Sequence, residues 1–185
     1  FYADVIDEVG DDRLKVYLYH IPQVAQVGIP LSLIGRLRKE FPDVVVGLKD
    51  SSGDCSNTKA ILDTYPGFEV FPGAELFLLD GLRNGAVGVI SATANVGAAA
   101  MRKLYENWQG PDADKMQADI SAFRKTFQSY PVIPLLKAVV AHYRNDPVWA
   151  ETRAPFTNMP EADAKAAIQK LAEMYGFKLS FDEAA

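Results

Sequence analysis

Short apolar runs alternate with amphipathic stretches along the first part of the chain. A short apolar run bounded by turn-forming residues predicts a strand, whereas apolar residues that recur three or four positions apart predict a helix. In chain order, the patterns predict strands at 14–22, 44–49, 68–73 and 87–91, and helices at 32–41, 57–65, 75–84 and 96–108. The valines of 44–49 are typical of a strand buried on both faces of a parallel sheet. Ser56 or Asn57 is the expected N-cap of the helix at 57–65.

From about residue 112 onward, the strand patterns stop. The remaining periodic stretches, at 115–130, 135–144 and 161–175, all predict helices. We therefore expect two portions, an α/β portion at residues 1–110 and a helical extension at residues 111–185.

Alternating strands and helices imply parallel strands that are joined by helical crossovers. Four such units make half of a (β/α)8 TIM barrel, which typically needs about 250 residues. An open doubly wound sheet is the alternative, although no G-x-G-x-x-G sequence follows a predicted strand, which argues against dinucleotide binding. Since residues 1–9 read as the end of a helix that began earlier, we expect the chain to be the C-terminal half of a longer barrel.

The composition narrows the classes of partner. The 185 residues include 19 Lys and Arg against 24 Asp and Glu, for a net charge of −5. This mild acidity argues against nucleic acid or an anionic membrane as the main partner. A single cysteine, with no signal-peptide or membrane-spanning pattern, indicates the cytoplasm. The two histidines are far apart and no Cys/His cluster occurs, so we predict no metal site.

The ends of the predicted strands carry the candidate chemistry, because catalytic groups of α/β barrels lie at the carboxyl ends of strands. If the barrel closes, Tyr19 and Lys49 lie on adjacent strands and face one pocket. The alternatives are structural. Lys49 could form an ion pair with Asp50 or Asp54, and Tyr19 could be a core aromatic like Tyr17, two residues earlier on the same strand face.

A lysine in such a pocket loses hydration, which disfavours its charged ammonium form. The neutral amine can attack a ketone and form an imine. Once protonated, the imine stabilises a carbanion on the neighbouring carbon, as aldol cleavage and condensation require. A nearby tyrosine can carry protons to and from the substrate oxygen. Backbone N–H groups at 88–91, or in the turn after Lys49, could hold a carboxylate.

Five motifs occur in order along nearly the whole chain: YHIP (19–22), GLKDSSGD (47–54), GAVGVISATAN (85–95), PLLK (134–137) and RAP (153–155). Together they resemble the dihydrodipicolinate synthase / N-acetylneuraminate lyase family. The resemblance implies a (β/α)8 TIM barrel with a C-terminal helical extension, often assembled as a homotetramer. It also implies class I aldolase chemistry through a Schiff base between a pyruvate-type substrate and a lysine, with no cofactor.

On this resemblance, Lys49 is the imine-forming lysine and Tyr19 is the catalytic hydroxyl. The candidate substrate-binding residues, each at or just after a predicted strand end, are Ile90, Ser51, Gly73 and Glu75. Ile90 stands where the family places a strand-end backbone contact near the bound keto acid. The turn that contains Ser51 could instead serve only as a helix cap.

Some features separate this sequence from the best-known members. The family's Gly-Thr-Thr-Gly-Glu motif and the second tyrosine of its proton relay would precede the stretch seen here. Dihydrodipicolinate synthases usually carry an arginine shortly after Tyr-Asn-x-Pro, whereas residues 23–28 contain none. Sialic acid lyases bind sugar hydroxyls with polar residues at places that here hold Ala74, Glu75, Leu76 and Ala92.

The sequence therefore predicts a lyase or aldolase that acts on pyruvate or a small 2-oxo acid, and lysine biosynthesis is not favoured. A 2-keto-3-deoxy sugar acid dehydratase and a 4-hydroxy-2-oxoglutarate-type aldolase are alternatives on the same scaffold. A barrel that binds a 2-oxo acid without turning it over is the alternative of another class.

Overall fold

The structure is a computed structural model, and it describes residues 1–175. The chain divides into two compact units, one at Phe1–Ile90 and one that begins at Ser91. Our expected division lay after residue 110. Whether residues 91–110 belong to a barrel portion stays a prediction.

The first unit is built on a sheet of three parallel strands in the order β1-β2-β3. The strands are β1 (Val16–His20), β2 (Val45–Asp50) and β3 (Glu69–Pro72). The helices of this unit are α1 (Tyr2–Val9), α2 (Pro22–Ala25), α3 (Leu31–Glu40), α4 (Cys55–Thr64), the short 3-10 helix η1 (Glu75–Phe77) and α5 (Leu78–Arg83). The α/β class, the parallel pairing and three of the predicted strands are confirmed.

The predicted fourth strand is wrong, because residues 87–91 do not form a strand. The segment nevertheless follows β3: the Val87 N–H donates to the Val70 carbonyl and the Ile90 N–H to the Pro72 carbonyl, each at 3.1 Å. The two carbonyls are two residues apart, but the two amides are three apart. One extra residue therefore interrupts the even spacing that a parallel ladder needs.

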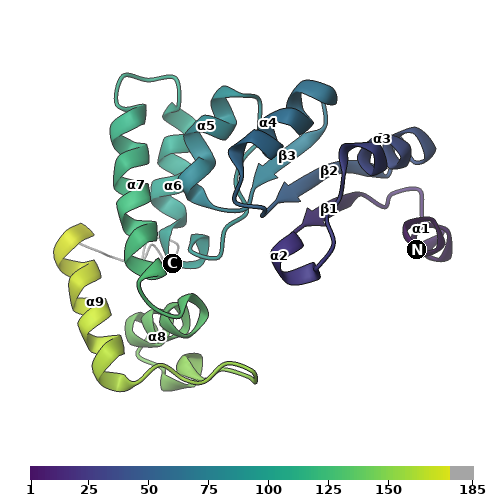
Figure 1. Cartoon of the computed structure of the whole chain (residues 1–185). Helices are drawn as coiled ribbons and strands as arrows, with labels where there is room; N and C mark the ends of the chain where they lie inside the picture. Colours follow the sequence, from purple (N-terminus) through teal and green to yellow (C-terminus); the bar gives the residue numbers. More distant parts are fainter. Residues whose placement is uncertain (176–185) are drawn as a thin grey trace. The chain divides into compact units, whose positions relative to one another are not determined.

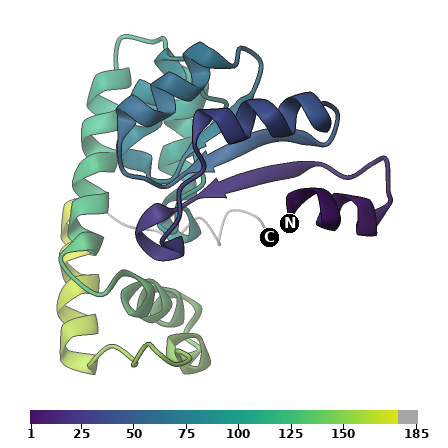
Figure 2. The same cartoon turned by 45° about the vertical axis from the view of Figure 1, so that its right-hand side comes forward.

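One face of the sheet is the core of the first unit. Side chains alternate along a strand, and Leu18, Leu48 and Val70 point to the same side, where all are almost completely buried. Figures 1 and 2 show α3 and α4 together on one side of the strands. The buried cluster on this side comprises Leu18, Ile29, Ile34, Leu37, Val45, Leu48, Ile61, Phe68 and Val70.

The opposite face of the sheet is partly open. Tyr17 and Tyr19 are 42% and 51% exposed on it, and the neighbouring Lys49 is half-buried. The expectation that β2 is buried on both faces is therefore wrong for this structure. The apolar residues of β2 indicate the one face that is fully covered. Lys49 lies near the end of the strand on the other face.

Gly47 in β2 is required by close packing on this open face. A Cβ atom at Gly47 would lie 2.3 Å from the Glu69 carbonyl oxygen and 2.5 Å from the Tyr17 ring. The ring crosses the strand here, because the Tyr17 hydroxyl donates to the Glu69 carboxylate.

We expect Gly47→Ala to lower the free energy of unfolding by about 2 kcal/mol or more, since a carbonyl of the sheet cannot move aside. Urea unfolding measures the change. The matched control is Gly88→Ala, where the nearest atom to a Cβ is a Phe71 ring carbon at 3.3 Å. Equal losses in the two variants would contradict the packing argument.

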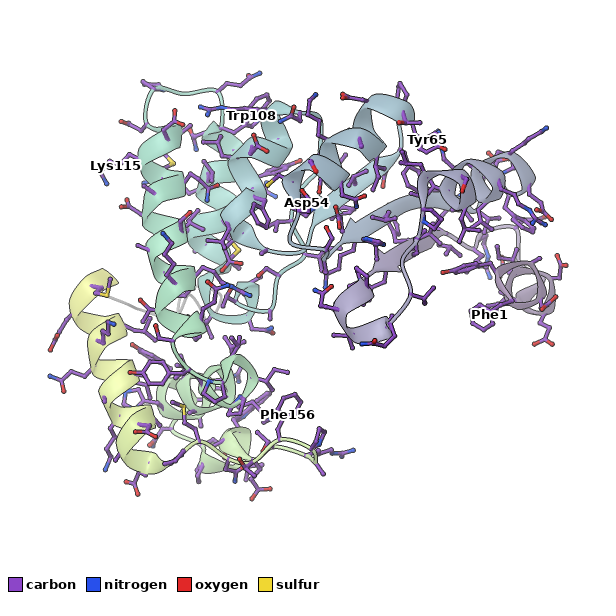
Figure 3. The ribbon with its side chains drawn as sticks, viewed as in Figure 1. Phe1, Asp54, Tyr65, Trp108, Lys115 and Phe156 are labelled. Atoms are coloured by element: carbon purple, nitrogen blue, oxygen red, sulfur yellow. The ribbon has the colours of Figure 1, made fainter. Side chains whose placement is uncertain are left out.

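Helix α4 begins earlier than expected. Its N-cap is Asp54, whose carboxylate accepts from the Ser56 N–H at 2.8 Å and from the Ser56 hydroxyl at 2.7 Å. The prediction of Ser56 or Asn57 as the cap is thus wrong, because aspartate is an equally good cap and takes the first position available. Figure 3 labels Asp54 at this helix start.

The second unit is helical over its described part. It contains α6 (Ala94–Asn107), α7 (Ala113–Gln128), α8 (Val132–Arg144), the short 3-10 helix η2 (Pro147–Ala150) and α9 (Glu161–Tyr175), which confirms the predicted helices. Phe123 and Phe127 are central to its core, where their ring centroids lie 5.0 Å apart. The backbone of α6 leaves helical geometry at Gly97, against which the Phe123 ring packs too closely to admit a Cβ.

Candidate active site

The candidate residues meet at the carboxyl edge of the three-stranded sheet. Tyr19 on β1 is the direct register partner of Lys49 on β2, and Lys49 is the partner of Phe71 on β3. Residues directly opposite in a sheet point to the same face. Parallel pairing therefore brings together two side chains that are 30 positions apart in the sequence.

Lys49 and Tyr19 are in direct contact on the open face. The Lys49 Nζ donates a hydrogen bond to the Tyr19 hydroxyl oxygen at 3.1 Å, and it lies 4.2 Å from the centroid of the Tyr19 ring. The same cation thus meets both the oxygen and the π face of the tyrosine. This geometry does not support the interpretation of Lys49 as an ion-pair partner of Asp50 or Asp54.

The two tyrosines of β1 differ in acidity. The hydrogen bond with Lys49 lowers the pKa of the Tyr19 hydroxyl; the Ser51 hydroxyl and the charge of Lys49 act in the same direction, against partial burial. For Tyr17, the hydrogen bond to the Glu69 carboxylate raises the pKa, and burial and the Glu69 charge raise it further. Of the pair, Tyr19 is the one poised to give up and regain a proton.

We expect Lys49→Gln to raise the pKa of Tyr19 toward the ordinary tyrosine value of about 10, because the ammonium stabilises the phenolate. The ionisation is measured by ultraviolet titration of tyrosinate, as the difference between each protein and its Tyr19→Phe counterpart. Lys59→Gln is the matched control, since Lys59 pairs with Asp63 within α4. An unchanged midpoint in Lys49→Gln would contradict the coupling.

Ser51 lies beside Tyr19, and Gly73 packs against Ser51. The Ser51 N–H donates to the His20 carbonyl at 2.8 Å. A Cβ at Gly73 would lie only 2.2 Å from the Ser51 hydroxyl oxygen, so the glycine makes room for the serine. The structure brings both residues to the site. Their contact with substrate stays a prediction.

Ile90 and Glu75 are placed differently. Ile90 is 42% exposed, but its N–H is donated to Pro72, so a backbone contact to substrate would use its carbonyl oxygen. Glu75 is completely buried at the start of η1. A fully buried carboxylate offers no surface to a substrate, so the geometry does not support Glu75 as a contact.

His20 and Asp50 lie on the other face of the sheet. His20 is buried and its Nδ1 accepts from the Ile29 N–H at 2.9 Å, so it points away from Tyr19 as strand alternation predicts. Asp50, which follows Lys49 directly, is only 4% exposed and is hydrogen-bonded by the start of α4. From the sequence, Asp50 was considered as an ion-pair partner of Lys49 and as part of a turn before a helix. The signal that was missed was the same alternation, which places positions 49 and 50 on opposite faces.

Residues 1–175 contain no group of three or more His, Cys, Asp and Glu side chains that could hold a metal ion. Within the same range, none of the helices combines the length and apolarity that crossing a membrane requires.

The sequence matches the Dihydrodipicolinate synthetase family over residues 1–174. The chain belongs to this family. An uncharacterized DapA-like lyase of Chloroflexus aurantiacus is 32% identical over 85% of this chain and 54% of its own length. The 4-hydroxy-tetrahydrodipicolinate synthase of Thermus thermophilus is 32% identical over 100% of this chain and 61% of its own.

Among solved structures of the dihydrodipicolinate synthetase family, the dihydrodipicolinate synthase of Agrobacterium tumefaciens superposes with a TM-score of 0.80 at 29% identity. That match covers 94% of this chain and 58% of the solved one. The chain therefore spans somewhat more than half the length of these three relatives.

Proposed function

We propose that the protein is a class I lyase or aldolase that binds pyruvate, or a 2-oxo acid that cleaves to pyruvate, as an imine on Lys49. The observation that carries the proposal is the 3.1 Å hydrogen bond between the Lys49 Nζ and the Tyr19 hydroxyl at the carboxyl edge of the sheet. Membership of a family whose named relatives include lyases supports it.

In the proposed mechanism, the neutral Lys49 amine attacks C2 of the 2-oxo acid, and the carbonyl oxygen leaves as water after proton transfer. When the C3–C4 bond breaks, its electron pair moves into the protonated imine and gives an enamine. The proton of the C4 hydroxyl passes to the Tyr19 oxygen as the aldehyde departs. Protonation of the enamine at C3 and hydrolysis then release pyruvate and restore the amine.

The lowered pKa of Tyr19 suits this role, because a more acidic phenol spends more time as the phenolate that accepts the proton. The Lys49 ammonium stabilises that phenolate in the free protein. Once the amine has become part of the imine, the protonated imine supplies the positive charge at the same place. The pair therefore places a cation beside the tyrosine before the amine loses its proton, and again once the protonated imine has formed.

We also propose that the open face of the sheet lines the interior of a (β/α)8 barrel. Faces of parallel sheets are normally covered on both sides, yet Tyr17 and Tyr19 are substantially exposed here. The relatives are longer than the region that this chain matches. In this proposal, polypeptide equivalent to their additional part supplies the remaining strands, and the assembly is a homotetramer.

A small 2-oxo acid is the proposed substrate class. Residues 21–30, which follow Tyr19, carry no charged side chain, and neither does the Gly73-Ala74 pair after β3. These residues therefore supply no cation for a second carboxylate. A 2-keto-3-deoxy sugar acid dehydratase and a 4-hydroxy-2-oxoglutarate-type aldolase would use the same imine.

The proposal is tested by incubating the protein with pyruvate and borohydride, followed by intact-mass spectrometry and peptide mapping. Reduction makes the imine permanent, and the expected result is one pyruvyl adduct per chain on Lys49. No adduct, or an adduct only on another lysine, would overturn the imine mechanism. A panel of 2-oxo acids then distinguishes a lyase from a binding protein, since trapping without turnover of any of them would favour the binding protein.

A further inference from the structure

The carboxylate of Asp50 is the centre of a buried hydrogen-bond cluster that the proposed chemistry does not use. One oxygen accepts from the Ser52 N–H at 3.0 Å. The other accepts from the Thr58 hydroxyl at 2.7 Å and from the Asn57 side-chain amide at 3.0 Å. Asp50 is 4% exposed and Thr58 is 8% exposed. The cluster thus joins the last residue of β2 to the first turns of α4.

The same strand end is also tied to both neighbouring strands. The Asp50 carbonyl accepts from the Gly73 N–H at 2.6 Å, just beyond β3. The Ser51 N–H donates to the His20 carbonyl, the last residue of β1. The Ser51 carbonyl accepts from the Gln23 side-chain amide of α2 at 2.6 Å. Hydrogen bonds therefore hold the backbone on the C-terminal side of Lys49 from α2, α4, β1 and β3.

This anchoring acts on the two side chains that meet Tyr19. Lys49 and Ser51 flank Asp50 in the sequence, and strand alternation turns both toward the face opposite to the Asp50 carboxylate. A rotation of the strand end about its axis would move both away from the Tyr19 oxygen. The carboxylate cluster opposes that rotation from behind the sheet.

We propose that Asp50 is a positioning residue that holds Lys49 and Ser51 against the Tyr19 hydroxyl through its bonds to Thr58, Asn57 and the Ser52 amide. The inference rests on the proposed function for its catalytic consequence, whereas its geometric consequence is independent of it. A buried carboxylate that loses a donor must relax or find another one, because an unsatisfied buried charge is costly. The strand end would relax with it.

The test compares Thr58→Val, which keeps the shape of the side chain but removes the hydroxyl, with Thr58→Ser, which restores the hydroxyl. Thr64→Val is the matched control on the same helix, since the Thr64 hydroxyl donates to the Ala60 carbonyl one turn earlier, at 2.6 Å. Asp50→Asn removes the charge at nearly constant shape. All variants are made in the intact protein.

The first measurement is the borohydride-trapped rate with pyruvate. Thr58→Val is expected to slow trapping at saturating pyruvate about tenfold, with the half-saturating concentration changed less than about twofold, because small misplacements of a reacting group mainly cost rate. Asp50→Asn is expected to slow it more. Thr58→Ser and Thr64→Val are expected to react like the unsubstituted protein.

The second measurement needs no imine. The ionisation of Tyr19 is followed by tyrosinate titration against Tyr19→Phe counterparts. The groups that face Tyr19 are Lys49 and Ser51, with Tyr17 and Glu69 farther back along the strands on the same face. Displacing Lys49 and Ser51 is expected to raise the pKa of Tyr19 in Thr58→Val and not in Thr58→Ser.

The outcomes separate this inference from the proposed function. If the unsubstituted protein forms no adduct, the imine mechanism fails, and the Tyr19 titration alone decides the role of Asp50. If Thr58→Val loses stability to urea but keeps the Tyr19 midpoint, and any trapping rate, of the unsubstituted protein, the cluster is only structural and the inference is overturned.

Discussion

Lys49→Ala is expected to reduce pyruvate trapping and any lyase activity by at least about a thousandfold, because alanine has no amine with which to form the imine. The effect is measured as the fraction of protein that carries a borohydride-reduced adduct, and as turnover of whichever 2-oxo acid proves to be the substrate. The peptide that contains residue 49 should lose its mass shift completely.

The fold is expected to survive this substitution. Lys49 is half-buried on the open face, where its Nζ donates to the Tyr19 hydroxyl. The loss of one exposed hydrogen bond costs about 1 kcal/mol. Lys59→Ala is the control for general loss of lysine, since that residue lies on α4 beside Asp63. Trapping in Lys49→Ala at the level of the unsubstituted protein would eliminate the mechanism.

Tyr19→Phe is expected to lower turnover about a hundredfold or more while leaving the reduced adduct on Lys49 detectable. The ring is retained and with it the π contact to the amine, but the group that carries the proton is lost. When steady-state turnover and the trapping rate are measured in parallel, turnover should fall much more than trapping. Turnover should fall because the C4 hydroxyl loses its proton acceptor, whereas imine formation can exchange protons with water.

Tyr17→Phe is the matched control for this prediction. It removes the same atom from the same strand face, two register pairs away, where the hydroxyl donates to Glu69. Tyr17→Phe should affect unfolding more than turnover, because the Tyr17 hydroxyl is bonded to Glu69, whereas Lys49 is bonded to Tyr19. Turnover should stay within about threefold of the unsubstituted protein. Equal turnover losses in the two variants would assign the effect to the sheet face and not to proton transfer by Tyr19.

The order of strands and helices in the first unit could be predicted because it depends on local pattern. The apolar run that ends at Lys49 lies in β2, and the stretch predicted at 14–22 contains β1. Both follow from residues that are near neighbours in the sequence. The strand predicted at 87–91 is wrong, because local pattern alone does not decide whether a segment pairs with its neighbour. This segment has the composition of a strand, but its pairing with β3 is interrupted by one extra residue, and sequence composition does not report register.

The sequence predicted those residues of the candidate site that belong to a motif and lie at a strand end. Tyr19 and Lys49 were identified from their place in the motifs, and the structure brings them into contact. Glu75 shows the limit of this reasoning. A glutamate at a helix start is usually exposed, and only the packing around η1 shows that this one is completely buried.

By itself, the sequence determined the α/β class, the parallel strands, the helices of the second unit and the position of Lys49 at the end of a strand. These depend on side-chain periodicity, which neighbouring residues set. Only the tertiary structure decided that Tyr19 faces Lys49 in register, that Asp50 is anchored by α4 behind the sheet, and that one sheet face is open. These depend on contacts between residues far apart in the chain, and many alternative pairings are compatible with the same local pattern.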